Sequence, residues 1–127
     1  MEKHFWTGAG ILAVLLILSV CITLAMKNAH APGAEAFRQA SELALDGELE
    51  QGKQRADTGR QQWYKSRTFT ACVADHSPMD QVEDLLAEME VFAKAEDAEH
   101  FAACCNQLAK ALEAMYDAHT FNLWNLL

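Results

Sequence analysis

The sequence predicts an all-α protein in which one N-terminal transmembrane helix precedes a small antiparallel bundle of three helices, the first of them long. Residues 7–26 contain no charged side chain. Alanine, leucine and glutamate dominate the composition, and only two prolines occur. Polar and apolar residues nowhere alternate with the period of two that is typical of strands, so the composition favours helices throughout.

The apolar run from Thr7 to Met26 is long enough to cross a bilayer. At 1.5 Å per residue a helix of this length measures about 30 Å, which is the thickness of the hydrocarbon core. Lipid offers no partners to backbone polar groups, so a lone membrane segment has to be helical. Phe5 and Trp6 suit the headgroup region at one end, and Lys27 follows the other end. The lipid bilayer is therefore the expected partner of residues 7–26.

A cleaved signal peptide is the alternative for this segment. Ala29-His30-Ala31 has the small-x-small pattern of a cleavage site, but Pro32 would follow the scissile bond, where its ring suits peptidases badly. We therefore expect a retained signal anchor. Basic residues flank the run on both sides, so they do not set its orientation. The short N-terminal tail favours a single-pass protein of the cell membrane with an extracytoplasmic C-terminal domain.

Proline and glycine divide the rest of the chain. Ala31-Pro32-Gly33 predicts a break after the membrane helix. A long helical pattern follows from residue 34 to residue 76. A kink or fraying is expected near Asp57-Thr58-Gly59, although the small residues there could also let another helix approach closely. The expected divisions are an N-terminal tail (1–6), the transmembrane helix (7–26), a linker (27–33), the helical domain (34–121) and an apolar C-terminal tail (122–127).

Two bends are expected to fold the helical domain into an antiparallel bundle. Ser77-Pro78 starts the second helix, and Asp97 caps the third after a bend at residues 95–97. This register places Trp63, Phe92 and Phe101 in one buried aromatic layer. It also places residues 53–67, with five basic side chains and one acid, against residues 80–99, with eight acids and one lysine.

The charge and motifs exclude several classes of function. A net charge of −8 argues against binding nucleic acid. The chain contains no pattern of a nucleophile beside a base, no phosphate-binding glycine loop and no paired carboxylates of an active site. We expect no catalytic residues, no enzymatic activity and no cofactor.

A metal or haem site is the alternative function. Cys72 and His76 are four residues apart, as are His100 and Cys104. Two such pairs could form a tetrahedral metal site, but the predicted register separates them by about 15 Å along the bundle axis. We expect free thiols at all four cysteines, with one of Cys104 and Cys105 in the core and the other at its edge.

The favoured function is a membrane-anchored interaction or structural module that binds a protein partner or itself. In the predicted bundle, residues 34–57 protrude toward the membrane as a stalk. The stalk leaves an apolar stripe uncovered, and a parallel homodimer or a membrane-protein partner would bury it. The candidate partner-binding residues are Phe37, Ser41, Leu45 and Leu49.

The sequence resembles the domain of unknown function 4363 family, which comprises small single-pass membrane proteins of Gram-positive spore-forming bacteria. The resemblance is carried by Trp63, by Asp75-His76 and by the closing Asn122-Leu123-Trp124-Asn125-Leu126-Leu127. It covers most of the chain and implies an anchored helical domain without an established activity. It supplies no catalytic residues. Cys104-Cys105 and the glycines of the first bundle helix depart from the pattern.

Overall fold

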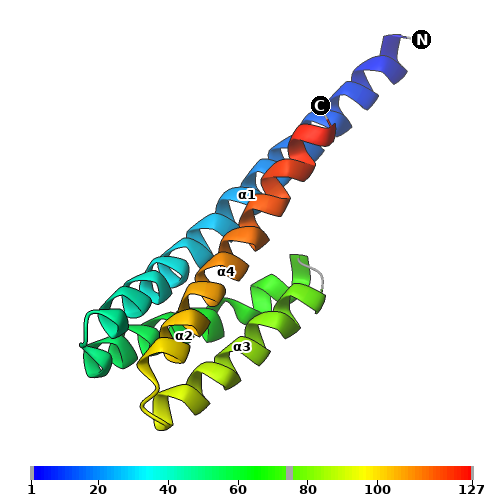
Figure 1. The fold of residues 1–127 in the computed structure, drawn as a ribbon. Coiled ribbons are helices and arrows are strands. Elements are labelled where there is room, and N and C mark those ends of the chain that lie inside the picture. Colours follow the sequence, from blue (N-terminus) through cyan, green and yellow to red (C-terminus); the bar gives the residue numbers. More distant parts are fainter. Residues whose placement is uncertain (1, 74–75, 127) are drawn as a thin grey trace.

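The computed structural model describes residues 2–73 and 76–126, with the side chains given up to Asp117. These residues form four helices and no strand: α1 (Glu2–Leu45), α2 (Leu49–Val73), α3 (His76–Lys94) and α4 (Ala98–Leu126). Figure 1 shows α1 as a long rod whose lower half packs against the other helices and whose N-terminal end extends beyond them. The predicted all-α class is confirmed.

Helix α1 continues without interruption through the expected linker. It contains Pro32, and its buried side begins at Met26 and continues with His30, Gly33 and Phe37. Pro32 removes one backbone N–H, but it lies on the exposed side of the helix. The buried side packs against the rest of the chain, and such packing supplies most of a helix's stability in a protein. The prediction of a linker at 27–33 is therefore wrong.

The break comes at residues 46–48 instead. Gly47 has a φ of 86°, and the N–H of Glu48 donates to the carbonyl of Leu43 at 2.9 Å while that of Gly47 donates to Ala44 at 3.3 Å. This pair of hydrogen bonds is a Schellman motif, which ends a helix at a left-handed residue. The predicted single helix over 34–76 is thus two helices, and α2 runs unbroken through the expected kink near Gly59.

Small residues hold α1 and α2 together. A Cβ added to Gly52 would lie 3.0 Å from the carbonyl oxygen of Ala40, and one added to Gly59 would lie 2.8 Å from the Phe37 ring. Ala56 lies between these glycines and is buried. The glycines therefore let a neighbouring helix approach closely. The fraying expected from the sequence is wrong, because α2 is continuous.

The four helices pack unequally. Helix α1 packs closely on α2 and α4, and α3 packs on α4. Helices α2 and α3 approach each other mainly through charged side chains, Arg67 to Glu83 at 2.7 Å and Arg60 to Glu90 at 3.8 Å. The predicted facing of the basic stretch against the acidic helix is confirmed.

The expected aromatic layer forms only in part. Trp63 and Phe101 are each 1% exposed, whereas Phe92 is half-buried and stacks on His100 with the ring centroids 5.0 Å apart. The ring beside Trp63 is His30 of α1, at 5.7 Å between centroids. The predicted layer left α1 outside the bundle, and α1 supplies this neighbour.

The bend between α3 and α4 is where the sequence placed it. Glu96 has a φ of 54°, and the N–H of Asp97 donates to the carbonyl of Phe92 at 3.1 Å. Asp97 then caps α4 by accepting a hydrogen bond from the backbone N–H of His100 at 3.2 Å. The predicted cap is confirmed.

Candidate functional site

An open groove lies between α2 and α3, where these two helices stand apart. It has a volume of about 280 Å³, and Phe101 of α4 contributes to its apolar lining together with Ala56 and Met89. All three side chains are buried. The remaining lining residues are Lys53, Asp57, Arg60, Glu90, Ala93 and Lys94. The groove thus combines an apolar floor with a charged rim.

The rim of the groove carries more positive than negative charge, although the chain as a whole is acidic. Arg60 hydrogen-bonds Asp57 at 2.6 Å and lies 3.8 Å from Glu90, so one guanidinium is shared between the two carboxylates of the rim. The hydrogen bond to Asp57 raises the pKa of Arg60. Lys53 pairs with Glu50 at 3.0 Å, whereas Lys94 makes no ion pair with any residue that the structure describes.

The helix segments that line the groove lie at the end of the molecule farthest from the N-terminus (Figure 1). It is bounded by the first turns of α2 and the last turns of α3. Sequence reasoning missed it, because a closed bundle was expected there. The sequence feature that could have predicted the groove is the excess of long charged side chains where α2 faces α3. Such side chains keep two helix axes apart.

A second group of polar side chains is buried in the core. Nε2 of His30 lies 2.7 Å from Oγ1 of Thr70, and both side chains are no more than 1% exposed. The Thr70 hydroxyl donates its single proton to the carbonyl of Ser66 at 2.8 Å, so the imidazole Nε2–H donates to Thr70. Nε1 of the adjacent Trp63 has no partner among the described residues. Burial lowers the pKa of His30, which favours the neutral ring.

Sequence reasoning also missed His30, because it lay in the expected linker. The signal was the spacing of Met26, His30, Gly33 and Phe37 in steps of three and four, which continues one helical face across Pro32. This cluster is closed to solvent and connects α1 to α2, so it stabilises the fold and offers no binding site.

The four residues of the alternative metal site do not converge. Cys72 lies near the end of α2 and His76 begins α3, so this pair is split between two helices. His100 and Cys104 lie on α4, beyond the other end of α3, which is about 27 Å long. No group of three or more potential metal ligands occurs among the residues that the structure describes.

The cysteines are free thiols, as expected. Cys104 and Cys105 are both buried, so the expectation that one lies at the edge is wrong. Burial raises the pKa of Cys104, with a further contribution from Glu88, whose Oε2 lies 3.9 Å from the sulfur. Burial raises the pKa of Cys105 to about 12. Neither thiol is poised as a nucleophile.

The predicted partner-binding stripe is not an exposed surface. Phe37 is fully buried and Ser41 is 8% exposed, because α2 and α4 cover this part of α1. Leu45 is 65% exposed at the end of α1, and Leu49 is half-buried at the start of α2. The prediction of a protruding stalk over residues 34–57 is therefore wrong. The end of α1 and the start of α2, which make up these residues, both pack into the bundle.

Comparison with known proteins places the chain in a family. The model of a domain of unknown function, DUF4363, matches residues 25–126. The chain belongs to the DUF4363 family. No curated protein and no solved structure matches the sequence. In this DUF4363 protein, α1 carries a stretch long and apolar enough to cross a membrane, and its place near the N-terminus suits an anchor or a signal sequence.

Proposed function

We propose that this DUF4363 protein is a membrane-anchored helical interaction module. Residues 7–26 hold it in the cell membrane as a single-pass protein, and its bundle lies on the extracytoplasmic side. The groove between α2 and α3 binds a protein partner. The observation that carries the proposal is the groove itself, an apolar recess whose rim has more positive than negative charge in a chain whose net charge is −8.

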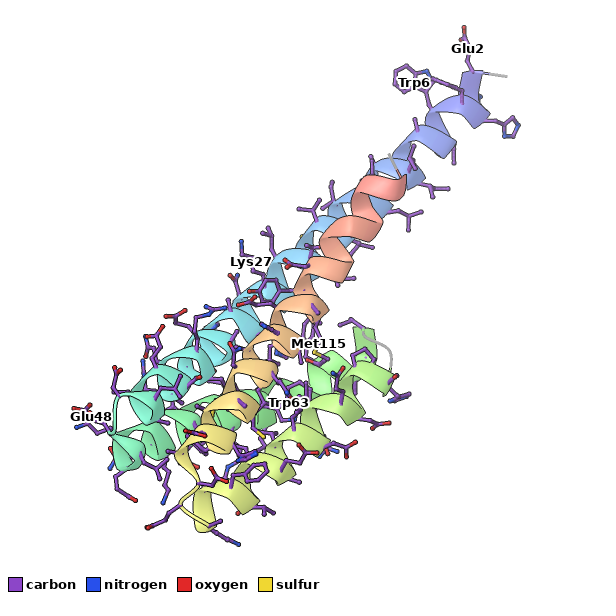
Figure 2. The ribbon with its side chains drawn as sticks, in the orientation of Figure 1. Glu2, Trp6, Lys27, Glu48, Trp63 and Met115 are labelled. Carbon is purple, nitrogen blue, oxygen red and sulfur yellow. The ribbon has the colours of Figure 1, made fainter. Side chains whose placement is uncertain are left out.

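Burial at the end of the apolar run supports a retained anchor. Met26 and His30 have exposures of 0% and 1% and pack against the remainder of the bundle. Cleavage after Ala31 would remove both side chains from the core. Removing a large buried side chain typically lowers the free energy of unfolding by about 2–5 kcal/mol. That is a large share of the stability of a domain of this size. Figure 2 shows Trp6 and Lys27 near the two ends of the apolar run.

The chemistry of the groove suits a particular kind of partner segment. Lys94 is unpaired among the described residues, and Lys53 pairs only with the exposed Glu50. An acidic side chain on the partner would meet these amines, while a neighbouring apolar side chain would cover Met89 and Phe101. We infer binding and not catalysis, since the guanidinium of Arg60 is already engaged and the two buried thiols are protonated.

Site-specific photocrosslinking in native membranes tests this proposal. A photoreactive phenylalanine analogue at Ala93, in the groove, should give a discrete adduct. The same analogue at Ala87, which is exposed on α3 and outside the groove, should not. Combining the analogue with Lys53→Glu and Lys94→Glu should abolish the adduct, whereas the distant Lys110→Glu should leave it intact.

The mass of the adduct identifies the kind of partner. An adduct at twice the chain mass would assign the groove to a second copy of this chain, and a different mass to a foreign protein. Equal adducts from Ala93 and Ala87, or no adduct from Ala93, would overturn the proposed site.

A further inference from the structure

The close approach of Gly33 and Leu112 sets the register of α4 along α1, and the longer side chains of Arg38 and Glu113 meet nearby. A Cβ on Gly33 would lie 3.5 Å from Cδ1 of Leu112, and Arg38 forms an ion pair with Glu113. The two helices run antiparallel, so each step forward along α4 is a step back along α1. Leu126 follows Leu112 by about 14 residues, and the residue about 14 positions before Gly33 is Ser19.

The last two turns of α4, residues 119–126, therefore lie beside residues 19–26. These are the final two turns of the apolar run. Figure 1 shows the end of α4 alongside α1, well past the rest of the bundle and short of the N-terminus. The end of α4 is thus level with part of the segment that the proposed function places in the membrane.

The exposure pattern of α1 agrees with a neighbour at this level. Ser19, Ile22 and Thr23 are half-buried, at the spacing of one helical face. Thr23 donates its hydroxyl proton to the carbonyl of Ser19 at 2.9 Å. The aliphatic side chains on the other faces of this part of α1 are exposed: Ile17, Leu18, Val20 and Leu24. Small or polar residues such as Ser19 and Thr23 at a helix contact are typical of paired helices in lipid.

The sequence at the end of α4 suits the same environment. Residues 118–127 contain no Asp, Glu, Lys or Arg, and they include Phe121, Leu123, Trp124 and Leu126. Tryptophan is enriched where the hydrocarbon core meets the headgroups. The backbone of residues 119–126 is helical, so its hydrogen bonds are mostly satisfied internally.

We propose that the last two turns of α4 enter the lipid bilayer beside α1, from the side of the membrane that holds the bundle. This inference rests on the proposed anchor. Eight residues of helix reach about 12 Å, past a headgroup layer of about 5–8 Å and into the outermost hydrocarbon. The membrane anchor then consists of α1, which crosses the bilayer, and the end of α4, which enters only its outer layer.

The length of the apolar run supports this placement. If the end of α4 stayed in water, residues 19–26 beside it would stay in water too. Only residues 7–18 would then remain for the hydrocarbon core, and they measure about 18 Å as a helix against a core of about 30 Å. Placing both helix ends in lipid removes this mismatch.

Fluorescence quenching by brominated lipids tests the inference on the full chain. The protein is reconstituted in phosphatidylcholine vesicles brominated at acyl carbons 6 and 7, or at 11 and 12, or unbrominated. The contribution of Trp124 is the difference between the parent and Trp124→Phe. We expect this difference signal to be quenched, and more strongly by the shallow bromines than by the deep ones.

Two matched variants serve as controls. The difference signal of Trp63→Phe reports a side chain buried in the bundle and should not respond to brominated lipid. That of Trp6→Phe reports the anchor independently. A Trp124 signal that brominated lipids leave unquenched would overturn the inference, and quenching of Trp6 in the same vesicles would show that the anchor itself stands. An unquenched Trp6 would contradict the proposed anchor.

Discussion

Nε2 of His30 lies 2.7 Å from Oγ1 of Thr70, and this hydrogen bond joins helices α1 and α2 across 40 residues of sequence. The Thr70 proton is committed to the carbonyl of Ser66, so the ring must be the donor. Because burial lowers the pKa of His30, the core accommodates the neutral imidazole better than the cation.

The stability of the protein should therefore depend on pH through His30. The folded pKa lies below the unfolded value of 6.5, so the unfolded chain binds a proton first as the pH falls. The free energy of unfolding should be constant with respect to this group above about pH 7 and should decrease from pH 6.5 downward. Chemical unfolding in detergent micelles between pH 8 and 5 measures the effect.

Two variants isolate the contribution of His30. In His30→Gln, whose amide can still donate to Thr70, the decrease below pH 6.5 should be smaller than in the parent. His76→Gln, at an exposed position at the start of α3, should keep the decrease of the parent. Identical pH profiles for His30→Gln and the parent would show that the ring is not held neutral in the core.

Trp63 should be the most sensitive single position of the core. It is 1% exposed, and truncating a buried aromatic to alanine typically costs about 3–5 kcal/mol. Trp63→Phe keeps a ring and removes an N–H that has no partner among the described residues, so it should cost less. Thermal unfolding followed by circular dichroism gives both values. A Trp63→Ala variant that unfolds within a few degrees of the parent would contradict the described core.

Gly59 and Gly33 should respond oppositely to alanine. At Gly59 the new Cβ would lie 2.8 Å from the fully buried Phe37 ring. Gly59→Ala should therefore lower the free energy of unfolding by about 1–2 kcal/mol, although alanine has the better helix propensity. At Gly33 the nearest atom would lie at 3.5 Å, an ordinary contact, so Gly33→Ala should gain about 0.5–1 kcal/mol. Equal effects at the two positions would refute the close α1–α2 contact.

Glu96→Gly should stabilise the turn between α3 and α4. Glu96 has a φ of 54°, a left-handed conformation that costs most residues about 1–2 kcal/mol and glycine almost nothing. We expect a gain of about 0.5–1 kcal/mol in the free energy of unfolding. Gly47→Ala is the opposite change, because it places a side chain at a φ of 86°, and it should lower the free energy of unfolding. The turn geometry is refuted if Glu96→Gly is less stable than the parent.

Local signals predicted the second half of the chain well. Asp97 is a strong capping residue, and the basic and acidic stretches face each other through Arg67 and Glu83, so the start of α4 and the order of α2 beside α3 followed from the sequence. The half-buried Phe92 shows the limit of this reasoning, because a register along one helix pair does not say which further helix covers it.

The helix boundaries in the first half of the chain were harder to predict, because the residues that usually end a helix do not end one there. Pro32 and Gly33 normally mark a helix end, yet the buried face around them holds α1 together. The true end at Gly47 lies in a sequence without proline. For the glycines of α2, helix propensity favoured fraying over the close approach of another helix, whereas the ring of Phe37 and the carbonyl of Ala40 occupy the space that the glycines leave. The groove arises from the spacing of α2 and α3, and the charged side chains that face each other there were interpreted only as a sign of register.

In our proposal α1 is at once the membrane anchor and a core helix of the bundle. Intact mass spectrometry of the protein extracted from carbonate-washed membranes distinguishes this from a cleaved signal sequence. We expect a chain that still contains residues 2–31 and remains in the membrane fraction after the wash. A chain that begins at Pro32 and is released in soluble form would contradict it.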